Sequence, residues 1–125
     1  MPSIAIIGAS PDRSKYGNKA VRAFVQGGWT VYPVTPKADT VEGVKAYRSL
    51  AEIPGHVDRV SLYVPPAVAL TMIEDIAARK PVELFLNPGA ESDALVAAAK
   101  AHGLDPILAC SVVNIGLRPD MFPDK

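Results

Sequence analysis

Five short apolar runs recur along the chain, separated by polar segments rich in proline and glycine. They read SIAIIG (3–8), WTVYPV (29–34), DRVSLYV (58–64), VELFLN (82–87) and PILAC (106–110). Most of them are nearly continuous in apolar residues and do not alternate strictly with polar ones. Such runs are typical of strands buried on both faces, as in a parallel sheet covered by helices. The pattern therefore predicts five parallel strands.

Between these runs the apolar positions follow a helical spacing. The spacing predicts helices over residues 17–26, 66–79 and 91–102, and a short helical turn over 49–53. Pro66 suits a first helical turn, because the N–H that proline lacks would be unpaired there. Strands therefore alternate with helices along the chain.

This alternation predicts one α/β domain over residues 1–125, with a Rossmann-like, doubly wound, five-stranded parallel sheet and helices on both faces. Right-handed crossovers leave few topologies. We expect the strand order 3-2-1-4-5, with 2-1-3-4-5 as the alternative. Residues 117–125 are expected to be an irregular surface tail.

The composition narrows the classes of partner and compartment. Formal net charge is zero, which argues against nucleic acid or an anionic membrane as the main partner. No apolar run approaches the ~18 residues of a membrane span. The single cysteine, Cys110, excludes an internal disulfide, so we expect a structural thiol in a cytoplasmic protein. Two isolated histidines, His56 and His102, do not form a metal site.

In an open parallel sheet, ligands bind beyond the carboxyl ends of the strands, where the winding direction reverses. The first such segment, residues 8–18, contains a turn glycine, Gly8, followed by Ser10, Arg13 and Lys15. The helix that follows offers free backbone N–H groups and the positive end of its dipole. The segment is therefore interpreted as a phosphate site. The alternative is an ordinary loop with solvated charges.

The second segment, residues 34–39, has Lys37 in the region where NAD-binding folds place an acid for the ribose. A lysine there suits a ribose phosphate, as in NADP or coenzyme A, or else it is simply exposed. YVPP (63–66) provides a rigid apolar wall for an adenine, or only ends a strand. NPG (87–89) allows close approach of a ligand, or only forms a turn.

Catalytic motifs are not evident in the chain. The sequence contains no G-x-S-x-G, Walker A or H-E-x-x-H pattern, and no pair of acids is placed in the expected crevice. The expected protein is therefore not an enzyme by itself.

The motifs IIGAS, YPVTPK, YVPP and NPG, each at the end of a predicted strand, resemble those of the small stand-alone CoA-binding proteins. These are similar to the N-terminal domain of the succinyl-CoA synthetase α subunit. The resemblance implies binding of coenzyme A without ligase activity, because the domain with the phosphorylated histidine has no counterpart here. By matched motif, the resemblance implies four groups of contacts. The phosphates would be faced by Gly8, Ala9, Ser10, Lys15 and Tyr16, and the nucleotide end would be lined by Pro33, Val34, Pro36 and Lys37. The adenine would be flanked by Tyr63, Val64, Pro65 and Pro66, and the pantetheine would pass near Asn87, Pro88 and Gly89.

Three functions are therefore weighed. The first is a non-catalytic module that binds, senses or delivers coenzyme A or an acyl-CoA. The second is an NADP-dependent oxidoreductase or a fragment of one, for which Lys37 is compatible but a catalytic acid or base is missing. The third is a protein-interaction domain with a vestigial crevice. A homodimer or another protein partner is compatible with exposed sheet edges.

Overall fold

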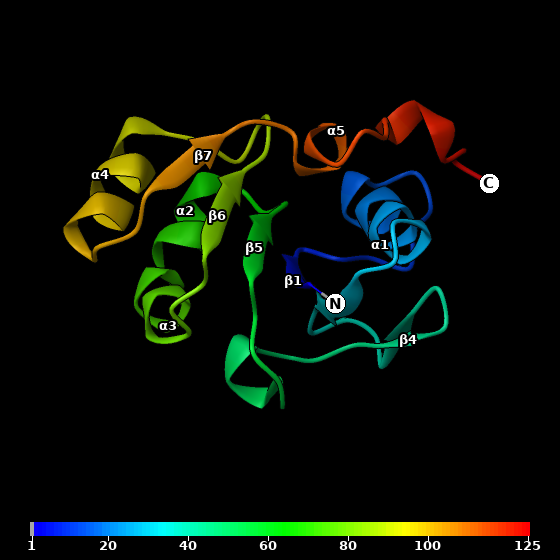
Figure 1. Cartoon of the computed structure of the whole chain (residues 1–125), viewed down its shortest axis with the longest axis horizontal. Coiled ribbons are helices and arrows are strands. Elements are labelled where there is room, and N and C mark those ends of the chain that lie inside the picture. The colour runs from blue at the N-terminus through cyan, green and yellow to red at the C-terminus, as the bar shows by residue number, and fades with distance from the viewer. Residues whose placement is uncertain (1) are drawn as a thin grey trace.

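Five parallel strands form the main sheet, and each lies within a run expected to be a strand. The computed structural model describes residues 2–125. The sheet consists of β1 (Ser3–Ile7), β2 (Thr30–Val34), β5 (Arg59–Leu62), β6 (Glu83–Leu86) and β7 (Pro106–Leu108), arranged side by side in the order β2-β1-β5-β6-β7 (Figure 1). The expected α/β class and parallel sheet are confirmed.

The expected strand order 3-2-1-4-5 is wrong, and the alternative 2-1-3-4-5 is correct. The third main strand, β5, pairs with β1 and not with β2, which leaves β2 at the edge. Pro33 in β2 explains why. Its carbonyl faces the outer edge, where it accepts a hydrogen bond from the Tyr47 N–H at 2.8 Å. Since proline offers no donor on that side, another sheet strand could not pair there completely.

Helices connect the strands and cover both faces of the sheet. They are α1 (Tyr16–Gln26), α2 (Pro66–Leu70), α3 (Ile73–Ala78), α4 (Asp93–Ala101) and α5 (Ser111–Asn114), with single 3₁₀ turns at Leu50–Glu52 and Pro119–Met121. The helix expected over 66–79 is divided at Thr71 and Met72. Their N–H groups donate to carbonyls three residues back, and the Thr71 hydroxyl donates to the Val68 carbonyl at 2.6 Å. These shorter bonds interrupt the α-helical pattern.

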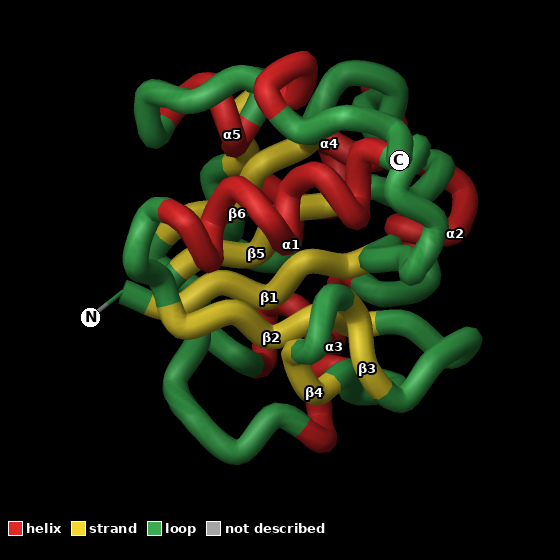
Figure 2. Tube along the Cα trace, turned by 90° about the vertical axis from the view of Figure 1, so that its right-hand side faces the viewer, coloured by secondary structure: helices red, strands yellow, loops and turns green. Residues whose placement is uncertain are grey.

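Alternate residues of β1 point into two separate cores. Ile4 and Ile6 pack with the apolar side of α1, whereas Ala5 and Ile7 pack with α2, α3 and α4. All four side chains are buried. Figure 2 shows α1 in front of the strands and α3 behind them. This arrangement leaves the two ends of the sheet, and not its faces, open to a ligand.

A small hairpin outside the main sheet was not expected. It consists of β3 (Thr40–Val41) and β4 (Val44–Lys45), which pair antiparallel. The two turn residues, Glu42 and Gly43, both have positive φ, at 51° and 77°. Positive φ at both central positions characterises the type I′ turns that join twisted strands.

The last nine residues, 117–125, pack on α1, so the expectation of an irregular surface tail is only partly correct. Phe122 is buried, and the Arg22 guanidinium donates to the Pro123 carbonyl at 2.9 Å. Lys19 and Asp124 form an ion pair at 2.5 Å. The tail and α1 also enclose an open groove of about 490 Å³, partly lined by Arg13.

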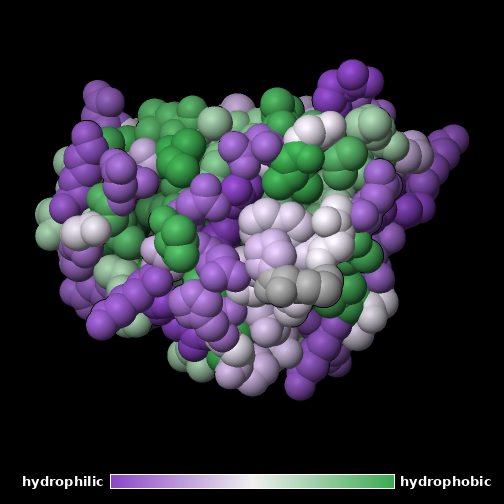
Figure 3. All heavy atoms as spheres, in the orientation of Figure 1, coloured by the Kyte–Doolittle hydropathy of each residue, from purple (hydrophilic) through white to green (hydrophobic). Residues whose placement is uncertain are grey.

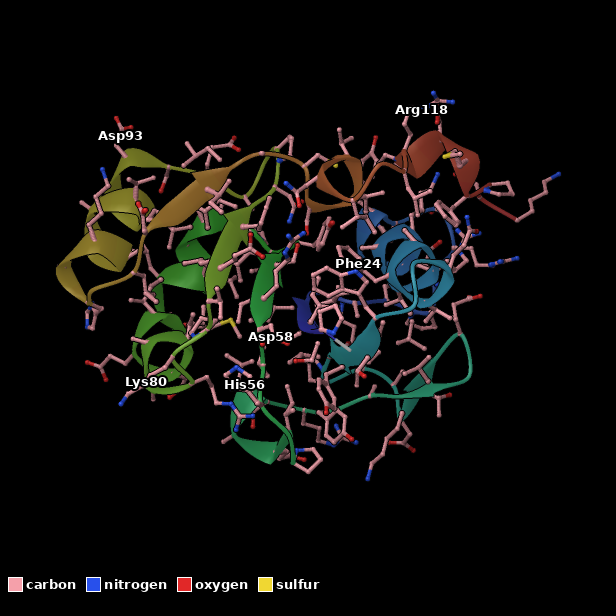
Figure 4. All side chains as sticks on the ribbon, in the orientation of Figure 1. Phe24, His56, Asp58, Lys80, Asp93 and Arg118 are labelled. Atoms are coloured by element: carbon pink, nitrogen blue, oxygen red, sulfur yellow. The ribbon has the colours of Figure 1, made fainter. Side chains whose placement is uncertain are left out.

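A buried arginine ties α5 to the sheet. The Arg59 guanidinium donates to the Glu83 carboxylate and, at 2.8 Å, to the Asn114 side chain of α5. The rings of Phe24, Trp29 and Phe85 surround it, with centroids 4.2–5.9 Å from its central carbon. In Figure 4, Phe24 projects from α1 toward the sheet. This cluster fixes α5 on the face of the sheet that α1 covers.

Candidate functional site

The turn after β1 is held between two neighbouring strand ends. The Gly8 N–H donates to the Val34 carbonyl at 3.1 Å, and the Tyr63 N–H donates to the Ile7 carbonyl at 2.8 Å. Gly8 has a φ of +91°, and a Cβ at this position would lie 2.6 Å from the Tyr63 carbonyl oxygen. Only glycine fits without strain. Three of the predicted segments therefore meet at one place.

The first turn of α1 lies directly against this glycine. A Cβ on Gly17 would overlap the Gly8 carbonyl oxygen, so the absence of a side chain brings the helix start onto the loop. No side chain caps the helix at Lys15. The first backbone N–H groups of a helix have no acceptor within it, and they carry the positive end of the helix dipole. This is the geometry of an anion site.

The polar loop before α1 is organised by its own side chains. The Ser10 hydroxyl accepts a hydrogen bond from the Asp12 N–H at 3.0 Å, and Asp12 accepts from the hydroxyl and N–H of Ser14. The Ser14 hydroxyl, followed by its backbone N–H, lowers the pKa of Asp12. Arg13 turns toward Glu42, with Nε 3.4 Å from the carboxylate. Lys15 is the cation of this loop that stays exposed.

Lys37 lies past the end of β2, at the β2 side of this site. Its side chain is exposed and makes no ion pair with the residues that the structure describes. Its backbone N–H donates to the Thr35 hydroxyl at 3.2 Å, which fixes the turn. Pro36 precedes it and is also exposed. Pro33 and Val34 lie inside β2 and are both buried, so they are less accessible than Pro36 and Lys37.

The YVPP segment passes beside Gly8 as the chain leaves β5. The Val64 side chain approaches within 3.0 Å of where a Gly8 Cβ would be. Pro65 caps α2 and Pro66 is its first residue. The Tyr63 hydroxyl oxygen is buried without a hydrogen-bond partner among the described residues. Burial raises the pKa of Tyr63 far above its ordinary value, so the phenol stays protonated.

Asn87 connects three elements and has no hydrogen free for a ligand. Its amide nitrogen donates to the Ser61 hydroxyl and the Leu62 carbonyl, both at 2.8 Å. Its amide oxygen accepts from the Ser111 N–H at 2.8 Å, at the start of α5. Asn87 therefore positions the walls of the site. Gly89, in the turn that follows, has a φ of +92° and is exposed.

A cavity of about 270 Å³ lies where these segments meet α5 and the tail. Four predicted residues line it: Tyr16, Tyr63, Asn87 and Pro88. Three further lining residues, Cys110, Val112 and Pro119, were not among those assigned to the ligand from the sequence. Cys110 follows β7, at the strand end where the crevice rule places a ligand. Pro119 carried no sequence signal, because its segment was expected to be irregular.

Other polar clusters lie elsewhere. His56 and Asp58 form a pair at 3.1 Å just before the amino end of β5, at the opposite end of this strand from the cavity (Figure 4). Within residues 2–125, no three histidine, cysteine or acidic side chains gather as a metal site. No helix in this range is long and apolar enough to cross a membrane. The face in Figure 3 mixes hydrophobic and hydrophilic residues without one continuous apolar surface.

Comparison with known proteins establishes the family. The sequence model of a CoA binding domain matches residues 2–116. The chain belongs to this CoA-binding domain family. The predicted resemblance is thereby confirmed, and the matched residues include every strand end described above. Residues 117–125 of this CoA-binding domain lie beyond the match.

Among curated relatives, the α subunit of ADP-forming acetate–CoA ligase II of Pyrococcus furiosus is 47% identical over 74 residues, which are 57% of this CoA-binding domain and 16% of the subunit. The chain therefore spans about a sixth of that relative. A conserved hypothetical protein of P. furiosus has a similar structure over 91% of this chain and 99% of its own, with a TM-score of 0.81 and 32% identity. Acetyl-coenzyme A synthetase 1 of Ca. Korarchaeum cryptofilum, with phosphate and ADP, matches over 86% of this chain and 25% of its own (TM-score 0.74, 29% identity).

Proposed function

We propose that this protein binds coenzyme A or an acyl-CoA at the carboxyl ends of its strands, without a reaction of its own. The observation that carries the proposal is the convergence of the Gly8 turn, the start of α1 and the YVPP segment in a chain of the CoA-binding domain family. The acid that NAD-binding folds use for the ribose is replaced in this region by the exposed Lys37.

The proposed pose follows the order of the strands. The phosphates lie over the N–H groups of the first α1 turn, beside Lys15, where charge-assisted hydrogen bonds are strongest. The 3′-phosphate lies toward Lys37 at the β2 edge. The adenine lies against Val64 and Pro65, and the pantetheine leads toward the ends of β6 and β7. Asn87 supports this path but does not itself bond the ligand.

We do not propose that this chain catalyses the reaction of a whole ligase. In the part of the chain that the structure describes, neither a histidine nor a carboxylate lines the cavity. We propose a role in holding, sensing or delivering the ligand, in a reducing cytoplasm that keeps Cys110 free.

A thermal-shift series with coenzyme A, acetyl-CoA, NAD and NADP tests the proposal. A ligand present at ~100 times its Kd adds about 2.7 kcal/mol to the free energy of unfolding. Coenzyme A compounds are expected to raise the Tm, and NAD is not. A Tm shift with NADP and none with coenzyme A would contradict the proposal and indicate a site for a dinucleotide cofactor. No Tm shift with any of the four ligands would indicate that the crevice is vestigial.

Lys37→Ala tests the assignment of the 3′-phosphate. A hydrogen bond to a charged group contributes about 1.5–3 kcal/mol, so the variant is expected to weaken coenzyme A roughly 10- to 100-fold by calorimetry. Dephospho-CoA, which lacks this phosphate, should be affected little. Lys100→Ala, on α4, provides a control for the loss of one surface cation. Equal losses for both ligands would remove Lys37 from this role.

A further inference from the structure

The cavity bounded by Tyr63, Cys110 and Val112 is too small for a whole coenzyme A. Its volume is about 270 Å³, whereas pockets that enclose a complete drug-sized ligand have volumes of about 300–1,000 Å³. Its inner walls are buried parts of the fold: Asn87 and Val112 are almost fully enclosed. The cavity therefore accommodates one end of a ligand.

Among residues 2–125, no charged side chain lines this cavity. Phosphates are bound by cations or backbone N–H groups, so the side chains of this lining offer them no charged partner. The phosphates have a better place at the start of α1, and the cavity adjoins that place through Tyr16, the first residue of α1. Tyr16 is two-thirds exposed and stands at the outer rim. A ligand held by its phosphates at α1 can reach past Tyr16 into the cavity.

The polar side-chain groups in the inner wall are already used or covered. Both amide hydrogens of Asn87 are donated to Ser61 and Leu62, and its oxygen accepts from Ser111. The Tyr63 hydroxyl oxygen is buried out of reach, so the phenol contributes its ring to the wall. Val112, Pro88 and Pro119 are apolar, and a thiol such as that of Cys110 forms only weak hydrogen bonds. The cavity therefore favours hydrocarbon.

This requirement distinguishes the parts of an acyl-CoA. The pantetheine arm carries two amides, whose N–H and C=O groups lose free energy when they are buried without partners. A short acyl chain has no such groups beyond its thioester. We propose that the cavity binds the acyl group of a short, uncharged acyl-CoA, so that the protein distinguishes such thioesters from free coenzyme A. This inference rests on the proposed function.

Calorimetric titration with a graded ligand set tests the proposal. The wild-type protein is titrated with coenzyme A, acetyl-CoA, butyryl-CoA and succinyl-CoA. Each fully buried methylene is expected to tighten binding about fourfold, so butyryl-CoA binds tighter than acetyl-CoA by roughly tenfold or more. Succinyl-CoA has the same four acyl carbons but ends in a carboxylate, and it should bind more weakly than butyryl-CoA by at least that factor.

Cys110 gives a second measurement at the cavity itself. It is the only cysteine in the chain, so alkylation by iodoacetamide reports on this position alone. At equal saturation, butyryl-CoA is expected to slow the alkylation more than coenzyme A does. Equal protection by both would show that the pantetheine arm, and not the acyl group, fills the cavity, and would overturn the proposal.

Two substitutions at the same position complete the design. Cys110→Leu adds volume to the wall and should erase the preference for butyryl-CoA over coenzyme A. Cys110→Ser, which keeps the size of the side chain, should retain the preference. If Cys110→Leu does not fold, the titrations and the alkylation of the wild-type protein still decide the question.

The outcomes separate this inference from the function beneath it. Affinities that do not depend on acyl length, or succinyl-CoA bound as tightly as butyryl-CoA, overturn the acyl site but leave coenzyme A binding intact. If none of the four ligands binds, the proposed function itself fails.

Discussion

The Gly8 turn packs against the end of β5 without room for a side chain, and this contact provides a sharp test of the site geometry. In Gly8→Ala, the new Cβ would lie 2.6 Å from the carbonyl oxygen of Tyr63 and 2.8 Å from its carbonyl carbon. Both atoms belong to the backbone, which cannot rotate away as a side chain could. Either the turn or the end of β5 must therefore move.

The chain contains a matched control. Gly89 has almost the same φ, +92° against +91°, but a Cβ there would meet nothing within 4 Å. Gly89→Ala therefore measures the conformational cost alone, about 1–2 kcal/mol for a non-glycine residue with left-handed backbone geometry. Gly8→Ala bears this cost and also that of forced displacement, typically about 1–3 kcal/mol. The expected total is roughly 2–5 kcal/mol, a large part of a domain's ~5–15 kcal/mol.

Urea denaturation followed by circular dichroism measures both variants against the wild type, with the midpoint giving the free energy when the m-value is unchanged. Gly8→Ala is expected to lose at least 1 kcal/mol more than Gly89→Ala. Losses equal within about 0.5 kcal/mol would refute the argument, because they would mean that the Gly8 turn has room for a side chain. The proposed phosphate loop would then not be fixed by the end of β5.

Three further predictions concern stability. Arg59→Ala leaves the Glu83 carboxylate without its buried partner and should lower the free energy of unfolding by about 3–5 kcal/mol in urea denaturation. The control Arg118→Ala, at an exposed arginine, should lower it by less than ~1 kcal/mol. Similar small losses for both variants would contradict the role of the buried cluster. Phe122→Ala should cost about 2–3 kcal/mol if the tail is a fixed part of the α1 core, and an unchanged midpoint would show that it is not. The pKa of Asp58 is lowered, mainly by the hydrogen bond that its carboxylate accepts from the backbone N–H of Ser3. The contribution of the Asp58 carboxylate to stability is therefore complete above about pH 4, and it is lost as the pH falls through the folded-state pKa. Asp58→Asn should therefore flatten the acid limb of the stability profile, and an unchanged limb would refute this linkage.

The strands and their parallel arrangement could be predicted because the same physics acts locally and globally. Residues 4–7 form an apolar run because both faces of β1 are buried, so the sequence itself indicates this burial. The strand order is harder to predict than the strands themselves, because it depends on which strands pair and not on the residues of any one strand. Pro33 did carry that information, because a proline is disfavoured in a central strand and so indicates an edge.

The site shows the same division. Gly8 and the YVPP segment could be found because glycine and proline constrain the backbone wherever they occur. Pro119 could not be found, since it enters the cavity only because Phe122 anchors the tail on α1. The role of Asn87 was predictable only in part: the sequence places it at a strand end, but its three hydrogen-bond partners come from residues 24 to 26 positions away.

The arginine cluster also gives this protein an optical reporter. Trp29 is the only tryptophan in the chain, and the Arg59 guanidinium lies 4.8 Å from its ring. Arg59 donates to Ser111 and Asn114 of α5, and the Ser111 N–H donates to Asn87 in the cavity wall. A ligand that shifts α5 would move the cation against the indole. We therefore expect the intrinsic fluorescence of Trp29, which packs on the same face of the sheet as α5, to follow occupancy of the cavity without a label.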